Sequence, residues 1–585
     1  MKMEKNSTQK SNPAKKLKVK VNTRGIPISS LGDIRIAIGY PPIESKKGVP
    51  LLSQNRQFQY FNAATYIYPM VPAYAASNLQ HHGYKVYWMD GIAEKKHYDE
   101  WIEELIAIRA DFLMVETKSP IVKTHWKQIK DLKKKLPHLR LMWVGDHVSF
   151  KPHELFENSP IDYAITGGDY DFMIVNLLNH IFLGERLEGG VYWRDGDLLI
   201  KAKPAGTKIL KTMLKGREKI HNSGRPNLKH NLNNLPFIDR DLTKWELYAY
   251  ENGNYKYTPA TYMYSGRDCW WNRCTFCVWD HTINPLGSYR SFSPERLFAE
   301  VKHVVDNYGV KEIFDDAGTL FVGPKLKKFC ELLISSGYNK KVRYGCNMRF
   351  NAVNQEYYDL MGKAGFRFIL YGMESGNQKT LDKLDKGTKE ADAINGPRMA
   401  RRAGLDPHVT IMLGYPWESY KDAQRTIAIA KYAFRKGYYE TMQATIIMPY
   451  PGTPLYEECK KKSWLLTNDY NKFDMRQAVM KTPFPAKKIY ELEQDLYSAF
   501  MTPQYITRKI LGIRSVHDAK YLFYMGWKLM GHLLDFDPGQ TKVGWTSLKF
   551  WKHAGGKLGG HFFSSKTSID AEKEAIKLAD SAMNL

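Results

Sequence analysis

Short apolar runs alternate with amphipathic stretches in the first third of the chain. Five apolar runs predict buried strands, at residues 33–40, 84–91, 110–120, 139–147 and 162–169. Between them, apolar side chains recur at helical spacing, as at Val71, Ala75 and Leu79 and again at Val122, Trp126 and Ile129. Strands that alternate with helices favour an α/β fold with a doubly wound parallel sheet.

Small or polar residues stand where these predicted strands end. In a doubly wound sheet, ligands bind at the carboxyl ends of the strands, and residues without bulky side chains let a large flat ligand approach the backbone. The sequence therefore indicates a ligand-binding face made by Thr117, Ser119, Gly145, His147, Gly167 and Gly168. For His147, a surface histidine that caps a loop is an equal alternative.

The same alternation resumes further along the chain and predicts six βα units. Ser293 and Ser419 begin two of the helices with N-cap spacing. Six units of this kind indicate a partial (βα)6 barrel, whose chemistry lies at the carboxyl ends of the strands. Polar residues gather at those ends: Asp315, Asp316, Arg349, Glu374 and Ser375. Strand-end capping, a salt bridge across the barrel mouth and a helix N-cap are the structural alternatives for them.

These patterns divide the chain into five parts. We expect a basic disordered tail at 1–31, an α/β domain at 32–188, a hairpin and linker at 189–254, a barrel at 255–485 and a helical region at 486–585. The hairpin prediction rests on a turn at Asp195 and Gly196.

Composition restricts the cellular setting. No run of uncharged apolar residues is long enough to span a bilayer, and the N-terminus lacks the apolar core of a secretory signal. The formal net charge is +25, and eight Lys or Arg face one Glu in the first 24 residues. Six cysteines in 585 residues do not form a disulfide framework. We expect a cytoplasmic protein, with contact to the inner face of a membrane as an alternative that the basic tail and an aromatic C-terminal helix suggest.

Three of the six cysteines stand within nine positions, at Cys269, Cys274 and Cys277. Metal binding explains this grouping better than core packing does. One interpretation adds His281 as a fourth ligand, for a zinc site in an RNA-binding module. The other is a [4Fe–4S] cluster, in which three thiolates leave one iron open to a ligand that is not protein. The position of the trio, directly after the first predicted barrel strand, favours the cluster.

Six motifs carry a resemblance to a known family. They are CWWNRCTFC at 269–277, FDDAG at 314–318, CNMR at 346–349, GMESG at 372–376, GYPWES at 414–419 and PYPGTPLY at 449–456. Their order and spacing resemble the radical S-adenosylmethionine (radical SAM) superfamily, in its cobalamin-binding branch. Segments VGDHVS and ITGGD of the first sheet resemble the cobalamin domain of that branch.

The chain departs from the family pattern in three ways. Four residues instead of three separate Cys269 from Cys274. The usual Gly-Gly-x-His and Gly-Glu segments are represented by Gly145, Asp146 and His147 and by Gly167, Gly168 and Asp169. The Asp-x-His-x-x-Gly signature is absent, so we expect no histidine ligand to cobalt from that motif.

The resemblance implies an enzyme. Cys269, Cys274 and Cys277 would hold a [4Fe–4S] cluster that cleaves SAM and generates a 5′-deoxyadenosyl radical. SAM would contact Phe276, Asp315, Asp316, Arg349, Glu374 and Ser375, and cobalamin would contact the ligand face of the first sheet. The expected reaction is cobalamin-dependent methylation of an unactivated carbon, and radical cyclisation or C–C coupling without methyl transfer is the alternative.

The expected partners follow from the same resemblance and from charge. A reductant protein such as ferredoxin or flavodoxin would supply electrons, and the substrate would be a small molecule of lipid-like or anionic character. We predict no specific nucleic-acid partner: methylthiolation of tRNA uses additional N-terminal cysteines, and this chain has none before Cys269.

Overall fold

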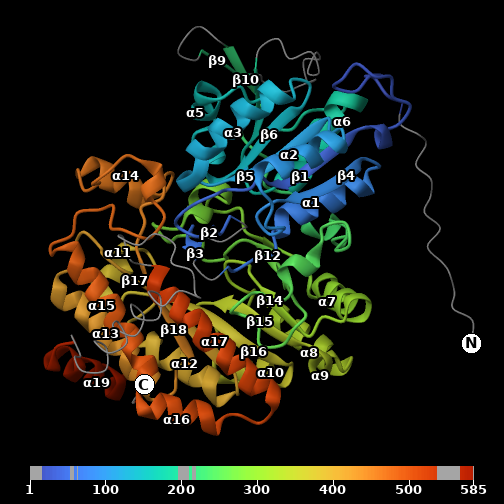
Figure 1. Cartoon of the computed structure of the whole chain (residues 1–585). Coiled ribbons are helices and arrows are strands. Elements are labelled where there is room, and N and C mark those ends of the chain that lie inside the picture. Colours follow the sequence, from blue (N-terminus) through green and yellow to red (C-terminus); the bar gives the residue numbers. More distant parts are fainter. Residues whose placement is uncertain are drawn as a thin grey trace, which may run out of the picture.

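The computed structural model describes residues 16–52, 58–61, 64–194, 210–213, 219–535 and 567–583, with side chains of the long C-terminal helix described to residue 526. The predictions for the start of the basic tail and for the turn at Asp195 and Gly196 lie outside these residues. Two α/β regions lie one above the other, with the first sheet at the top of Figure 1 and the second below it.

The first region is a doubly wound sheet of eight strands in the order β4-β1-β5-β6-β7-β8-β10-β9. Five parallel strands coincide with the five predicted runs: β1 (Arg35–Tyr40), β4 (Lys85–Asp90), β5 (Phe112–Thr117), β6 (Arg140–Gly145) and β7 (Tyr163–Ile165). Three antiparallel strands extend the sheet into the stretch expected as a hairpin and linker: β8 (Val191–Arg194), β9 (Leu210–Met213) and β10 (Lys219–Asn222).

Helices cover both faces of this sheet because its strands are apolar on both sides. Ile36 and Ile38 of β1 pack in the core with α1 (Met70–His81) and α6 (Tyr170–Leu183), whereas Ala37 belongs to the core on the other face. That other face carries α2 (Tyr98–Ala107), α3 (Val122–Lys135) and α5 (Pro152–Asn158), and the short α4 (Asp146–Phe150) follows β6 directly.

The second region is a parallel sheet of six strands in chain order, as the six βα units predict. Its strands are β11 (Ala260–Met263), β14 (Glu312–Asp315), β15 (Arg343–Met348), β16 (Phe366–Glu374), β17 (Asp406–Leu413) and β18 (Thr441–Ile446). No strand pair joins β18 to β11 in the described part of the chain, so the barrel is partial. The expected α/β fold class is confirmed.

Helices lie outside this sheet and begin where the sequence predicts. The Ser293 hydroxyl accepts a hydrogen bond from the Arg296 amide at the start of α7, and Ser419 forms a capping box with Asp422 at the start of α13. The helices are α7 (Pro294–Tyr308), α8 (Pro324–Ser335), α9 (Tyr338–Lys341), α10 (Gln355–Lys363), α11 (Gln378–Lys383), α12 (Asp392–Arg402) and α13 (Tyr420–Arg435).

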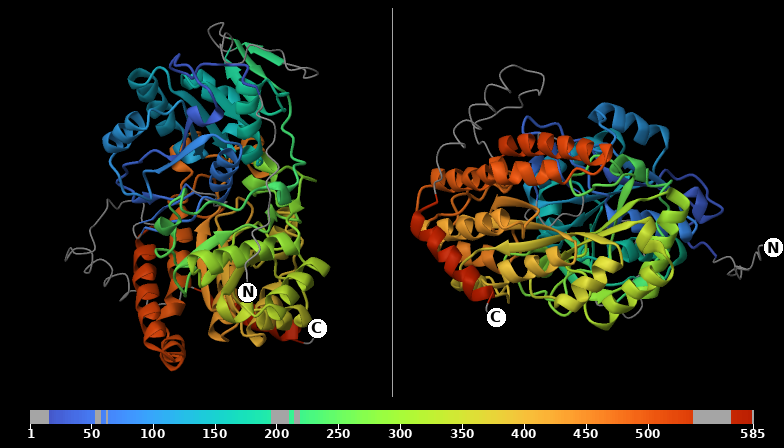
Figure 2. Two further views of the ribbon diagram at one scale, coloured as in Figure 1. Left: turned by 90° about the vertical axis from the view of Figure 1, so that its right-hand side faces the viewer. Right: turned by 90° about the horizontal axis from the view of Figure 1, so that it is seen from below.

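The C-terminal part is helical, as predicted, and closes the open side of the second sheet. Its described helices are α15 (Ala486–Ser498), α16 (Pro503–Leu511), α17 (Val516–Asp535) and α19 (Ile569–Met583), and α14 (Pro454–Lys461) precedes them in the part predicted as barrel. Figure 2 shows α16 and α17 side by side along the second sheet. Lys509 of α16 pairs with Glu440 before β18, and Asp518 of α17 pairs with Lys256 before β11 at 2.7 Å. The two helices therefore bridge the gap between the first and last strands.

Among the helices that the structure describes, none combines the length and apolar character needed to cross a bilayer.

Candidate active site

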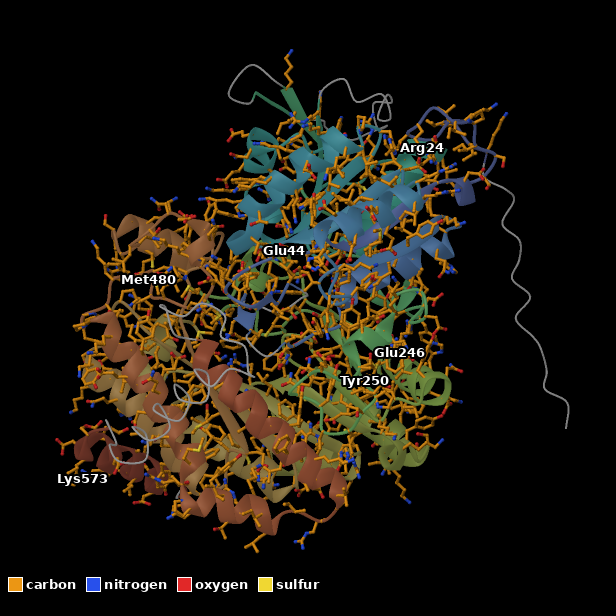
Figure 3. The ribbon with its side chains drawn as sticks, viewed as in Figure 1. Arg24, Glu44, Glu246, Tyr250, Met480 and Lys573 are labelled. Carbon is orange, nitrogen blue, oxygen red and sulfur yellow. The ribbon has the colours of Figure 1, made fainter. Side chains whose placement is uncertain are left out.

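A cavity of about 1040 Å³ lies within the partial barrel of the second sheet and reaches the carboxyl ends of its strands. All three clustered cysteines line it. It extends along the inner face of β16, β17 and β18 and is roofed by the β2 (Val49–Pro50) and β3 (Tyr60–Phe61) segment. Glu44, labelled in Figure 3, lies just before this roof, where the two α/β regions meet. The side chains that the sequence places at the barrel mouth thus face a space large enough for a cofactor and a substrate.

The cysteine loop follows the short strand β12 (Gly266–Arg267), which pairs with β13 (Arg290–Ser291). Asn272 accommodates the extra residue of the loop by adopting a positive φ of 49°. Gly318 is required beside Cys269, because an added Cβ would stand 2.7 Å from the Cys269 Cβ. The loop therefore bulges away from the strand while its thiols stay at the cavity.

Trp271 anchors the bulge to the neighbouring barrel loops. Its Nε1 donates a hydrogen bond to the Asp385 carbonyl at 2.7 Å, and its ring lies so close to Gly387 that a Cβ there would stand 2.1 Å away. The Arg349 guanidinium stacks on the same ring, 4.2 Å from its centroid. This stacking holds the Arg349 guanidinium, which directly follows β15, at the wall of the cavity that the three cysteines line.

Burial disfavours free thiolates in this pocket and raises the pKa of Cys269 to about 11 and that of Cys274 to about 12. The nearby Lys386 ammonium acts in the opposite direction on Cys274. Buried thiols with Lys386 and Arg349 close by suit iron, which deprotonates its thiol ligands and supplies positive charge. The donor set therefore fits a cluster held by three cysteines.

Glu374 and Lys386 form a buried ion pair at the cavity wall, with 2.6 Å between the Lys386 Nζ and Glu374 Oε1. Burial opposes the charged form of Lys386, but Glu374 and Cys274 outweigh it and raise its pKa. The second carboxylate oxygen, Oε2, is buried without a hydrogen-bond partner. Because a buried carboxylate oxygen needs a donor, this atom marks a position where a bound ligand would donate.

The structure brings four of the six predicted SAM contacts to the cavity: Phe276, Asp316, Arg349 and Glu374. Asp315 is absent from the cavity lining, and its carboxylate accepts hydrogen bonds from the Ser265 and Ala317 amides and from the Tyr344 hydroxyl. Burial raises the pKa of Asp315 to about 6. Ser375 donates to Glu418 at 2.6 Å instead of facing the cavity. These contacts with SAM stay predictions.

None of the six residues predicted to face cobalamin lines this cavity: Thr117, Ser119, Gly145, His147, Gly167 and Gly168. The hydroxyls bond histidines of the same region, Thr117 with His125 at 2.7 Å and Ser119 with His147 at 3.0 Å. At these glycines, the space that a side chain would occupy is already filled by other atoms of the protein. A Cβ on Gly145 would lie 2.3 Å from the Thr117 carbonyl oxygen, and one on Gly168 would lie 2.4 Å from the Asn284 side chain.

Two segments cover the carboxyl edge of the first sheet. Leu52, Phe58 and Tyr60 pack on Tyr40 at the end of β1. From the C-terminal side, the ring of Tyr470 lies 5.1 Å from the His147 ring. Together these residues form the cover, which we define as residues 47–61, as far as they are described, together with residues 469–476. The cover therefore lies over Tyr40 and His147 at the edge where the sequence predicts cobalamin.

Ion pairs couple the first sheet to the cysteine loop. Arg267, two residues before Cys269, is 2% exposed and donates to Asp171 at 2.6 Å and to the Gly168 carbonyl at 2.9 Å. Asp169 accepts from Arg290 and from His230. The Gly-Gly-Asp segment after β7 is therefore fastened to the strand that leads into the thiol pocket.

The zinc alternative finds little support in the geometry. The His281 Nε2 lies 3.0 Å from the Cys274 carbonyl oxygen. Within the described residues, no three His, Cys, Asp or Glu side chains converge closely enough to hold a single ion. A cubane spreads its irons over several ångströms, so its thiols need not converge on one point.

Sequence reasoning missed Lys386 and Trp271. Lys386 lies in a loop between α11 and α12, far from any strand end, and no pattern of the sequence separates it from neighbouring lysines. Trp271 lies within the cysteine motif, but its contacts with Asp385 and Gly387 arise only in the folded chain.

Comparisons with known proteins agree with this geometry. Residues 263–430, which contain the three cysteines, match the profile of the Radical SAM superfamily. An uncharacterized methyltransferase of Pyrococcus horikoshii is 24% identical over 447 residues, 76% of this chain and 89% of that protein. An anaerobic magnesium-protoporphyrin IX monomethyl ester cyclase of Cereibacter sphaeroides is 23% identical over 425 residues, 71% of this chain and 63% of that protein.

Two solved structures share the whole arrangement of domains. The cobalamin-dependent S-adenosylmethionine radical enzyme OxsB, solved with aqua-cobalamin and S-adenosylmethionine, superposes with a TM-score of 0.59 at 14% identity and covers 94% of this chain and 84% of that one. The radical S-adenosylmethionine methyltransferase TsrM of Kitasatospora setae has a TM-score of 0.55 at 13% identity and covers 94% of this chain and 99% of that one. Residues 263–430 therefore carry a Radical SAM domain, and the chain as a whole has the fold of cobalamin-dependent radical SAM enzymes.

Proposed function

We propose that the protein is a cobalamin-dependent radical SAM methyltransferase that acts on an unactivated carbon. The observation that carries the proposal is the meeting of Cys269, Cys274 and Cys277 with charged residues from three strand ends around one cavity. The similarity to a Pyrococcus methyltransferase and the fold shared with TsrM support methyl transfer.

The chain's own residues suit the binding of cluster and nucleotide. The three thiols would hold the cluster, and the Arg349 and Lys386 cations would offset its negative charge and that of a ligand carboxylate. The free Oε2 of Glu374 would accept a hydrogen bond from the ligand. When bound, the cluster supplies an electron to SAM for radical formation, and cobalamin supplies a transferable methyl group. The electron donor is external, and a ferredoxin or flavodoxin is the proposed source.

Radical cyclisation or coupling without methyl transfer is the second candidate. Two observations favour it: the similarity to the Cereibacter cyclase, and the absence of the six predicted cobalamin residues from the cavity lining.

Anaerobic reconstitution with iron, sulfide, SAM and a strong reductant tests the proposal. We expect 5′-deoxyadenosine from the wild-type enzyme and none from the Cys274→Ala variant. With a candidate substrate, S-adenosylhomocysteine that forms only when cobalamin is added supports methyl transfer. A modified substrate without S-adenosylhomocysteine supports cyclisation or coupling, and a lack of 5′-deoxyadenosine contradicts both.

A further inference from the structure

The inside of the partial barrel that the second sheet forms is a cavity. The residues that face inward on β16, β17 and β18 are only partly buried. They form two neighbouring rows across the strands: Leu370–His408–Thr441 and Gly372–Thr410–Gln443. All six line the cavity. Inward residues of a closed barrel normally fill its core with bulky side chains, so these rows border a chamber.

The chamber is long. Glu374 at the upper end of β16 and Arg367 near its lower end both line it. They stand seven positions apart, which corresponds to about 23 Å of strand at 3.3 Å per residue. The thiols lie at the upper end, so the cofactor site occupies only that part, and the remainder extends down to the starts of the strands.

Most of the surface that lines the chamber is apolar, although polar side chains such as Thr410 and Gln443 also face it. Seven of the described residues that line the cavity are methionines, among them Met348, Met412 and Met501. Methionine adapts its shape to irregular apolar ligands, because its side chain is unbranched and polarizable. The wall therefore suits a long hydrocarbon better than a compact polar metabolite.

The lower end leads to the surface at α16 and α17. Ile506, Ile510 and Ile513 line the cavity and are also 42%, 58% and 36% exposed. The ion pairs Lys509–Glu440 and Lys256–Asp518 stand at this end. Apolar side chains that touch both chamber and solvent mark an entrance, and the charged pairs provide a polar rim beside it.

We infer that the chamber binds a long-chain lipid, with its hydrocarbon chain directed toward the cysteine loop and its polar group at the α16–α17 rim. This inference rests on the proposed function and names the substrate class of the same site. It places the modified carbon in the apolar chain, because only the chain reaches the upper end of the chamber.

Oleic acid and octanoic acid are suitable probes, since they share a head group and differ in chain length. We expect the reconstituted enzyme to bind oleate at least tenfold more tightly than octanoate, measured by titration calorimetry below the concentration at which oleate aggregates. Equal affinities, or no binding of either acid, contradict the inference.

Chamber-filling substitutions test where the chain binds. Leu370→Trp adds bulk in the middle of the chamber and should weaken oleate binding at least tenfold. Ile106→Trp is the matched control, because Ile106 is 48% exposed on α2 and does not line the cavity. Met501→Trp, from the helical wall, replaces Leu370→Trp if that variant lacks a cooperative melting transition. Unchanged oleate affinity in a folded chamber variant overturns the inference.

Failure of this inference can be distinguished from failure of the proposed function. An enzyme that cleaves SAM but binds no oleate retains the proposed function and loses the lipid assignment. An enzyme that binds oleate in the chamber but never forms 5′-deoxyadenosine retains the lipid site and loses the proposed function. Transfer of lipid from vesicles, compared with detergent-dispersed lipid, shows whether the entrance draws its ligand from a bilayer.

Discussion

The carboxyl edges of the two parallel sheets differ, although both arise from the same alternation of strands and helices. At the second sheet the edge is open, and Cys269, Arg349 and Glu374 face a cavity. At the first sheet the edge is filled, because Phe58 and Tyr60 pack on Tyr40 and Tyr470 packs on His147. A strand-end position thus predicts where a ligand can bind. Whether a ligand can reach that position depends on segments that are distant in the sequence.

The cysteines of the open edge give the largest expected effect. Cys274→Ala should abolish iron binding and 5′-deoxyadenosine formation, because two thiolates cannot hold a cubane against solvent. Iron and sulfide analysis and the visible iron–sulfur absorbance measure the loss. Cys330→Ala is the control, since Cys330 is buried in α8 away from the cavity. It should keep its iron and lose about 1 kcal/mol of stability. Wild-type iron content in Cys274→Ala would contradict the cluster assignment.

One glycine substitution on each edge sharpens the comparison. In Gly372→Ala, the new Cβ would lie 2.2 Å from Glu374 Oε1, which displaces the buried ion pair. SAM affinity should fall about tenfold, roughly 1.4 kcal/mol. In Gly145→Ala, the Cβ meets a backbone carbonyl at 2.3 Å and φ is 113°, so stability should fall by about 3 kcal/mol. Titration calorimetry with SAM measures the first effect, and urea denaturation measures the second. Loss of SAM affinity in Gly145→Ala together with loss of stability in Gly372→Ala would show that the two edges are misassigned.

The ion network between the edges makes stability depend on pH. Burial opposes the charge on His230, but hydrogen bonds to Asp169 and Glu188 outweigh it and raise its pKa to about 9. A raised folded-state pKa stabilises the protein fully below the unfolded pKa of about 6.5, and this contribution disappears as pH rises through 9.

The expected loss is about 1–2 kcal/mol, after allowance for partial solvent screening. Urea denaturation at pH 7 and at pH 10 measures it. His230→Gln should reduce the difference in the free energy of unfolding between pH 7 and pH 10. An equally large difference in that variant would mean that the pH dependence arises from other groups.

The cover of the closed edge gives the smallest expected effect. Lys47 pairs with Asp474 and also donates to the Asn471 carbonyl, so it joins the two segments of the cover. Lys47→Met should loosen the cover and increase affinity for cobalamin about threefold, about 0.65 kcal/mol. Titration followed by the cobalamin absorbance measures this, with the exposed neighbour Lys46→Met as the control. Weaker binding in Lys47→Met would mean that the cover assists the cofactor.

Local signals predicted the elements well. The five apolar runs of the first region and the six of the second became parallel strands, and Ser293 and Ser419 cap the helices that they were expected to begin. The six-strand pattern and the cysteine motif were sufficient for the fold class and for the Radical SAM domain. Such signals succeed because burial, capping and strand ends depend on neighbouring residues.

The sequence alone determined the two α/β regions, the thiol trio and the strand ends where a ligand could bind. Only the tertiary structure decided that Asp315 and Ser375 serve internal hydrogen bonds, that Lys386 joins the site, and that the cover lies on one edge and the chamber on the other. The reason is physical: these outcomes depend on contacts between segments up to several hundred residues apart, as in the pair of Lys47 with Asp474, and no local periodicity records them.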